Sequence, residues 1–70
     1  MNTMNKLEII KHIAYRKSEK EHLYLTLKLL DSLHHQSPFS EKTYNEIRAK
    51  FSSAIAQCDI SIRDHEKLLE

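Results

Sequence analysis

The sequence predicts an all-α fold: an antiparallel helical hairpin that carries a short N-terminal helix. The 70 residues contain no glycine and a single proline, which leaves few positions for the positive backbone angles that tight β-hairpins need. Apolar side chains recur every three or four residues along most of the chain, which is the period of an amphipathic helix. The length suits one small domain, residues 1–70, with a core that is marginal by itself.

The short N-terminal helix is expected at residues 4–16. Asn5 and Glu8 have the spacing of an N-terminal capping box. Apolar residues then recur from Leu7 to Ala14 on one helical face. The sequence therefore predicts an amphipathic helix that begins near Asn5.

A bend is expected in residues 16–22, which read RKSEKEH and contain no apolar side chain. Ser18 and Glu21 repeat the capping-box spacing, so a second helix is expected at 19–36. The alternative is one continuous helix from about residue 4 to 36, because helices tolerate every residue type in this segment.

The third helix is expected at residues 41–69. Pro38 disfavours helical geometry at the preceding residue, so the second helix should end near Gln36. Ser40 is a natural N-cap, and Glu41 follows it at the positive end of the helix. Because the connection is short, the second and third helices should pack as antiparallel neighbours. The expected hairpin core consists of Leu23, Leu27, Leu30, Tyr44, Ile47, Phe51, Ile55, Cys58 and Ile62.

The leucine-rich segment at residues 23–33 has more apolar surface than one neighbouring helix can bury. It holds six leucines in eleven residues, and these form two stripes roughly 120° apart on a helix. One stripe belongs to the expected core. The second consists of Leu25, Leu29 and Leu33, here called the outer leucines, whose exposure to water would forfeit roughly 5 to 9 kcal/mol. Either the N-terminal helix covers them in a three-helix bundle, or another protein does.

Composition argues against several classes of function. The net charge of +1 gives no reason to expect nucleic acid binding, and no apolar run is long enough to span a membrane. The five histidines show no metal-ligand spacing, and no catalytic motif occurs. We therefore expect neither an enzyme nor a cofactor. The lone Cys58 fits a reducing cytoplasm, and its place among isoleucines predicts a small buried side chain.

The order of features resembles a family of small type III secretion co-chaperones. The resemblance begins with KLEII at residues 6–10, continues with RKSEKE at 16–21 before a leucine-rich helix, and reaches the cap at Ser40 followed four residues later by Tyr44. It then includes Ala54, Ile55, Asp59, Ile60 and Ile62. It covers about residues 6–65. The resemblance implies a cytoplasmic helical hairpin that binds a larger, tetratricopeptide-like chaperone and with it keeps the needle subunit unpolymerised.

The expected protein interface consists of the outer leucines with help from the N-terminal helix and from Tyr24. Its residues are Leu7, Ile10, Ile13, Tyr24, Leu25, Leu29 and Leu33. Tyr24 is the expected anchor, since aromatic residues are frequent in interface hot spots. The alternative function is that of a self-associating regulator, a homo-oligomer in which two hairpins form a four-helix dimer that modulates another protein.

Overall fold

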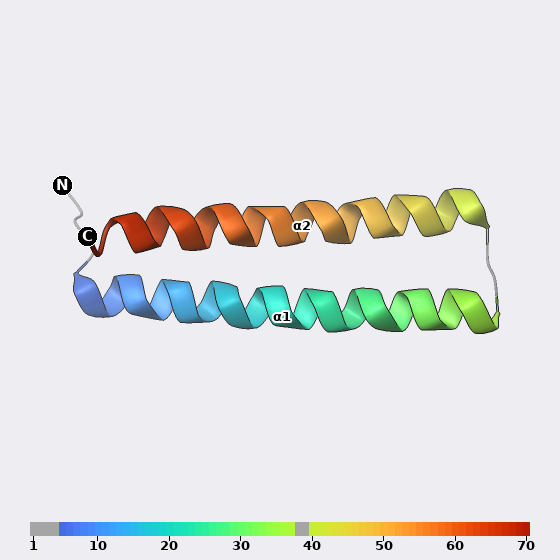
Figure 1. Ribbon diagram of the computed structural model, residues 1–70, viewed down its shortest axis with the longest axis horizontal. Coiled ribbons are helices and arrows are strands. Elements are labelled where there is room, and N and C mark those ends of the chain that lie inside the picture. Colours follow the sequence, from blue (N-terminus) through green and yellow to red (C-terminus); the bar gives the residue numbers. More distant parts are fainter. Residues whose placement is uncertain (1–4, 38–39) are drawn as a thin grey trace.

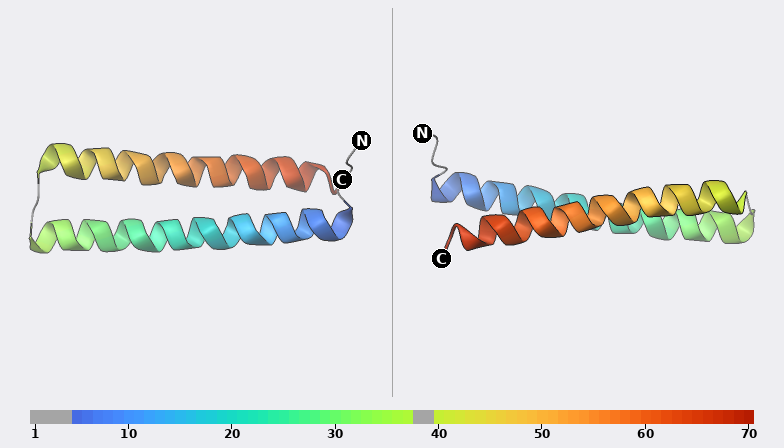
Figure 2. Two further views of the ribbon diagram at one scale, coloured as in Figure 1. Left: turned by 180° about the vertical axis from the view of Figure 1, so that it is seen from behind. Right: turned by 90° about the horizontal axis from the view of Figure 1, so that it is seen from above.

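The computed structural model describes residues 5–37 and 40–70, and its architecture is a two-helix antiparallel hairpin (Figure 1). Helix α1 spans Lys6–Gln36 and helix α2 spans Glu41–Lys67. The two helices run side by side in Figure 1 and cross at a shallow angle when seen from above (Figure 2, right), so that the start of α1 is near the end of α2. The molecule measures 50 × 17 × 17 Å, and is therefore a rod two helices across.

The prediction of three helices is wrong, because the described residues form two. Helix α1 continues without interruption through residues 16–22, where a bend was expected. The apolar pattern fades there because α1 presents charged side chains to α2, where Lys20 pairs with Asp59 and Glu19 accepts a hydrogen bond from Cys58. Arg16 and Glu19 also form an ion pair at 2.8 Å one turn apart on α1. The alternative of one continuous helix is confirmed.

The absence of a separate N-terminal helix also rules out, for the described residues, the three-helix bundle that was one of the two alternatives for covering the outer leucines. Residues 6–16, the part of that expected helix that lies in α1, form about the first third of α1 and lie beside the C-terminal part of α2 (Figure 1). The helices contain 31 and 27 residues, so their lengths nearly match and neither extends far beyond the other. No third helix in the described part of the chain covers the outer leucines.

The predicted N-caps are present at both helices. Asn5 Oδ1 accepts a hydrogen bond from the backbone N–H of Glu8 at 2.9 Å. Ser40 Oγ accepts one from the backbone N–H of Thr43 at 3.4 Å. Each cap satisfies a backbone donor that has no partner within its own helix.

The C-terminal ends agree closely with the predicted boundaries. Helix α1 ends at Gln36, and the N–H of Ser37 closes its last turn by donating to the carbonyl of Leu33 at 2.9 Å. The expected role of Pro38 in stopping this helix lies outside the described residues. Helix α2 ends at Lys67, two residues before the predicted position.

The two helices meet along a contact seam. It is defined as one row of residues on each helix that faces the other helix and recurs every three or four residues. This spacing is that of an antiparallel coiled coil. On α1 these positions are Ile9, Ile13, Arg16, Lys20, Leu23, Leu27, Leu30 and His34; on α2 they are Tyr44, Ile47, Phe51, Ile55, Cys58, Ile62 and His65, and Leu69 continues the row just beyond the end of α2.

Only five apolar side chains in the described residues are buried, and all lie on the contact seam. They are Ile9, Leu27, Ile55, Cys58 and Ile62. The remaining expected core residues are half-buried: Leu23, Leu30, Tyr44, Ile47 and Phe51. Ile9 was not among the expected core residues. It belongs to the core because the α1 spacing continues past the charged segment to the start of the helix.

Replacing Ser18 with alanine distinguishes a continuous helix from a capped bend by the sign of the effect. In the interior of α1, Ser18→Ala should raise the free energy of unfolding by a few tenths of a kcal/mol, roughly 0.3–0.5, because alanine has the higher helix propensity. At a real N-cap the same change costs about 1 kcal/mol. Ser40→Ala is the matched control and should show that loss. Urea unfolding measures both, and a loss of about 1 kcal/mol for Ser18→Ala would contradict the continuous helix.

Candidate protein-binding face

The outer leucines lie on the side of α1 that faces away from α2. Leu25 and Leu29 each keep 58% of their surface exposed, and Leu33 keeps 52%. By contrast Leu27, two residues from both Leu25 and Leu29, is 9% exposed. Two residues correspond to about 200° of helical rotation, so Leu27 points to nearly the opposite side of α1 from Leu25 and Leu29.

The N-terminal residues of the expected interface divide between two sides of α1. Leu7 and Ile10 are 60% and 51% exposed. Leu7 is eighteen residues from Leu25, a whole number of helical turns, so the two point in the same direction. Ile13 instead lies on the contact seam and is half-buried against α2. The apolar surface available to a partner on this side therefore includes Leu7 and Ile10.

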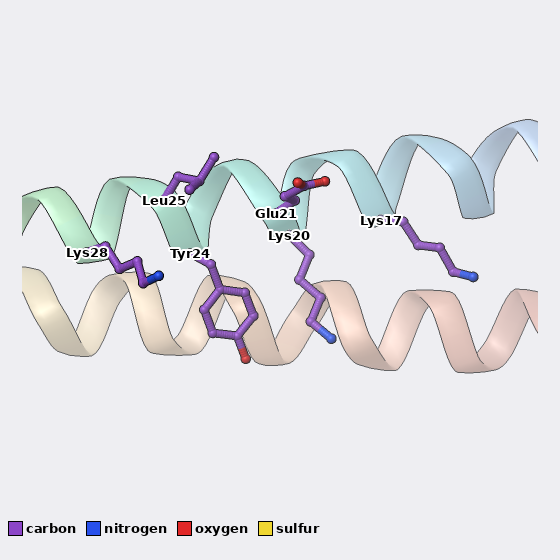
Figure 3. Close-up of a pocket in the computed structure, with 6 residues that line it drawn as sticks. All are labelled: Lys17, Lys20, Glu21, Tyr24, Leu25 and Lys28. Carbon is purple, nitrogen blue, oxygen red and sulfur yellow. The ribbon is translucent and has the colours of Figure 1, made fainter.

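A shallow hollow on α1, here called the Tyr24 hollow, borders the outer leucines. It has a volume of about 390 Å³ and is lined by Lys17, Lys20, Glu21, Tyr24, Leu25 and Lys28. In Figure 3, Tyr24 and Lys20 extend across α2, whereas Leu25 points away from it. The hollow thus has an aromatic ring and lysine side chains on one side and an exposed leucine on the other.

Tyr24 itself is half exposed and is contacted by a lysine that α2 holds in place. Lys20 forms an ion pair with Asp59 of α2, which raises the pKa of the ammonium group above its ordinary value. The Lys20 Nζ atom lies 5.9 Å from the centre of the Tyr24 ring, within the range of a cation–π contact. This contact places the Tyr24 ring beside Lys20 at the edge of the hollow.

A second group of polar side chains crosses the contact seam beside Lys20. Cys58 Sγ donates a hydrogen bond to Glu19 Oε1 at 3.1 Å, and Arg16 pairs with the same oxygen. These donors lower the pKa of Glu19, with the Cys58 thiol as the larger cause. Burial raises the pKa of the Cys58 thiol, and Glu19 raises it further. The thiol is therefore a structural hydrogen-bond donor, and its raised pKa disfavours the reactive thiolate.

A third polar group joins the helices near the connection. The Tyr44 hydroxyl donates to Asp31, and Arg48 forms an ion pair with the same carboxylate at 3.4 Å. Both contacts lower the pKa of Asp31, with the tyrosine as the larger cause. The His34 ring stacks on Tyr44 with ring centres 4.0 Å apart. These contacts join polar side chains of α1 and α2 to one another at this end of the hairpin.

Two sets of exposed residues on the molecule were not part of the expected interface. The lysines of the Tyr24 hollow are Lys17 and Lys20, seven and four residues before Tyr24, and Lys28, four residues after it. This helical spacing was visible in the sequence, but Lys17 and Lys20 were interpreted as part of the expected bend. On α2, exposed residues form a thin stripe of mostly small side chains at Ala49, Ser53, Ala56 and Ile60. Among the described residues, no helix is long and apolar enough to cross a membrane, and no three side chains are placed to hold a metal ion.

Comparison of the chain with models of protein families, with curated proteins and with solved structures finds no match in any of the three. The resemblance to needle co-chaperones therefore stays a prediction from the residues.

The lowered pKa values of Glu19 and Asp31 predict a loss of stability in acid. A carboxylate with a lower pKa in the folded state stabilises it at pH values above the unfolded pKa, and this contribution disappears as pH falls through the folded pKa. We expect the urea concentration at the unfolding midpoint to decrease as the pH is lowered from about 5 to about 3. The double variant Glu19→Gln/Asp31→Asn should be less stable at neutral pH and should show a smaller fall over that window. If the stability of the variant decreased equally steeply in acid, Glu19 and Asp31 would not be the cause of the acid sensitivity.

Proposed function

We propose that this chain is a helix-binding protein that acts as a cytoplasmic co-chaperone of type III secretion. In this proposal it binds a larger, tetratricopeptide-like helical chaperone and with it keeps the needle subunit unpolymerised. The function is binding through packed apolar surfaces, without a reaction or a cofactor.

The observation that carries the binding function is the exposure of the outer leucines. Each keeps more than half of its surface in contact with solvent, on a helix whose only neighbour in the described structure is already on the opposite side. An exposed apolar stripe on a helix suits packing against the helices of a partner. Burial by a partner would also stabilise this small hairpin by mass action.

The secretion assignment depends on the resemblance of the sequence to the co-chaperone family. The features that support it are the charged segment before the leucine-rich residues, the cap at Ser40 and Tyr44 four residues later, which all lie on one hairpin. The hairpin architecture is the one that the resemblance implies.

A self-associating regulator is the second candidate, and the exposed α2 stripe favours it. Ala49, Ser53 and Ala56 have small side chains that would let another helix approach closely. Two hairpins that met through such faces would form a four-helix dimer. This function would require a stable homodimer of the purified chain.

Affinity capture with cross-linking from the native cytoplasm tests the first candidate. The tagged full chain should recover a tetratricopeptide-like chaperone, and Leu29→Asp should reduce that recovery by on the order of tenfold or more, since it places a charge in the apolar contact. Asn45→Asp, an exposed position on α2, is the matched control and should behave as the wild type.

Circular dichroism should show that both variants remain helical. Failure to recover such a chaperone would overturn the secretion assignment, and unchanged recovery with Leu29→Asp would overturn the binding face. A stable homodimer of the chain alone in sedimentation analysis would instead support the regulator.

A further inference from the structure

We infer that the outer face of α1 binds a helix that carries acidic side chains beside its apolar stripe. The outer face is defined as the side of α1 within about 80° of the direction of Leu25. This inference rests on the proposed binding function and adds the chemistry of the partner.

The charges of the outer face are predominantly positive. Lys11, Lys17 and Lys28 lie within this arc and are exposed. Among the described residues of α1, Glu21 is the only carboxylate in the same arc. A nearly neutral chain therefore has a local excess of positive charge at its largest exposed apolar stripe.

Two other carboxylates near Lys17 and Lys28, those of Glu19 and Asp31, are directed toward α2 by their polar contacts. Glu19 accepts hydrogen bonds from Cys58 and Arg16. Asp31 accepts from Tyr44 and pairs with Arg48. The polar contacts of the seam thus leave Glu21 as the carboxylate that faces three lysines on the outer face, and the excess of positive charge remains.

Two lysines of the Tyr24 hollow are available to a partner. Lys20 is paired with Asp59, whereas Lys17 and Lys28 form no ion pair with any described residue. They are eleven residues apart, which corresponds to about 16 Å along the helix. A partner helix that ran beside the outer leucines would meet both lysines if its carboxylates had a similar separation, and its apolar side chains would contact Tyr24 and Leu25.

Charge also argues against a second copy of this chain as the occupant. A two-fold symmetric contact through the outer face would bring the same patch against itself. If the axis passed near Tyr24, Lys17 of one copy would approach Lys28 of the other, and like charges at a contact are unfavourable. An acidic helix has the complementary charge.

The test uses two synthetic amphipathic helical peptides with the same leucine stripe, one flanked by glutamates and one by lysines. Fluorescence anisotropy measures the binding of each to the full chain. At low salt the glutamate peptide should bind at least about tenfold more tightly, because complementary charges favour association and like charges oppose it. The preference should shrink at about 0.5 M salt, where screening shortens the range of the charges.

Two double variants of equal net charge supply the controls. Lys17→Glu/Lys28→Glu should abolish or reverse the preference for the glutamate peptide. Lys42→Glu/Lys50→Glu changes two exposed lysines on α2 instead, and should keep the preference.

The outcomes separate this inference from the proposed function. Equal binding of the two peptides would overturn the acidic partner while leaving the binding face intact. Binding of neither peptide would overturn the binding face, and the inference with it. A homodimer that buries the outer leucines and excludes both peptides would assign the face to a second copy and would also overturn the inference.

Discussion

Each helix of this hairpin has a single neighbour, and that constraint determines which apolar residues are buried. A helix in contact with one other helix can bury only one stripe of side chains along its length. In the leucine-rich half of α1 the buried stripe contains Leu27, whereas Leu25 and Leu29 remain mostly exposed. The division of one leucine-rich segment into a buried surface and an exposed surface follows from this geometry.

Because each helix has one neighbour, the contact seam holds the two helices together, and the middle of this seam is polar. Arg16 and Lys20 occupy positions where a coiled coil usually has apolar residues. Their partners, Glu19 within α1 and Asp59 on α2, fix the charged groups in one relative placement of the helices. Polar groups in such seams are known to specify register at some cost in stability. A narrow core with a polar centre is consistent with a protein that gains stability from a partner.

Much of the fold was predictable because local signals agree with one another. The absence of glycine and the helical period indicate an all-α fold, and the caps at Asn5 and Ser40 indicate both of the helix starts that the structure describes. The bend at residues 16–22 was a wrong prediction, because a segment without apolar residues looks the same whether it faces solvent or a polar partner. Only the second helix distinguishes the two cases, by placing Cys58 and Asp59 opposite the charged residues. Ile9 was missed for the same reason, because the expected bend at residues 16–22 interrupted the helical spacing that places Ile9 on the same face as Leu27.

The central claim is that adjacent leucines of α1 have separate roles, and equilibrium unfolding of two alanine variants tests it most directly. Leu27→Ala should lower the free energy of unfolding by about 2–4 kcal/mol, or abolish cooperative unfolding, because Leu27 is buried in the seam. Leu25→Ala should change it by less than about 0.5 kcal/mol. A similar large loss for both variants would show that Leu25 is buried in the isolated chain, and would contradict the account.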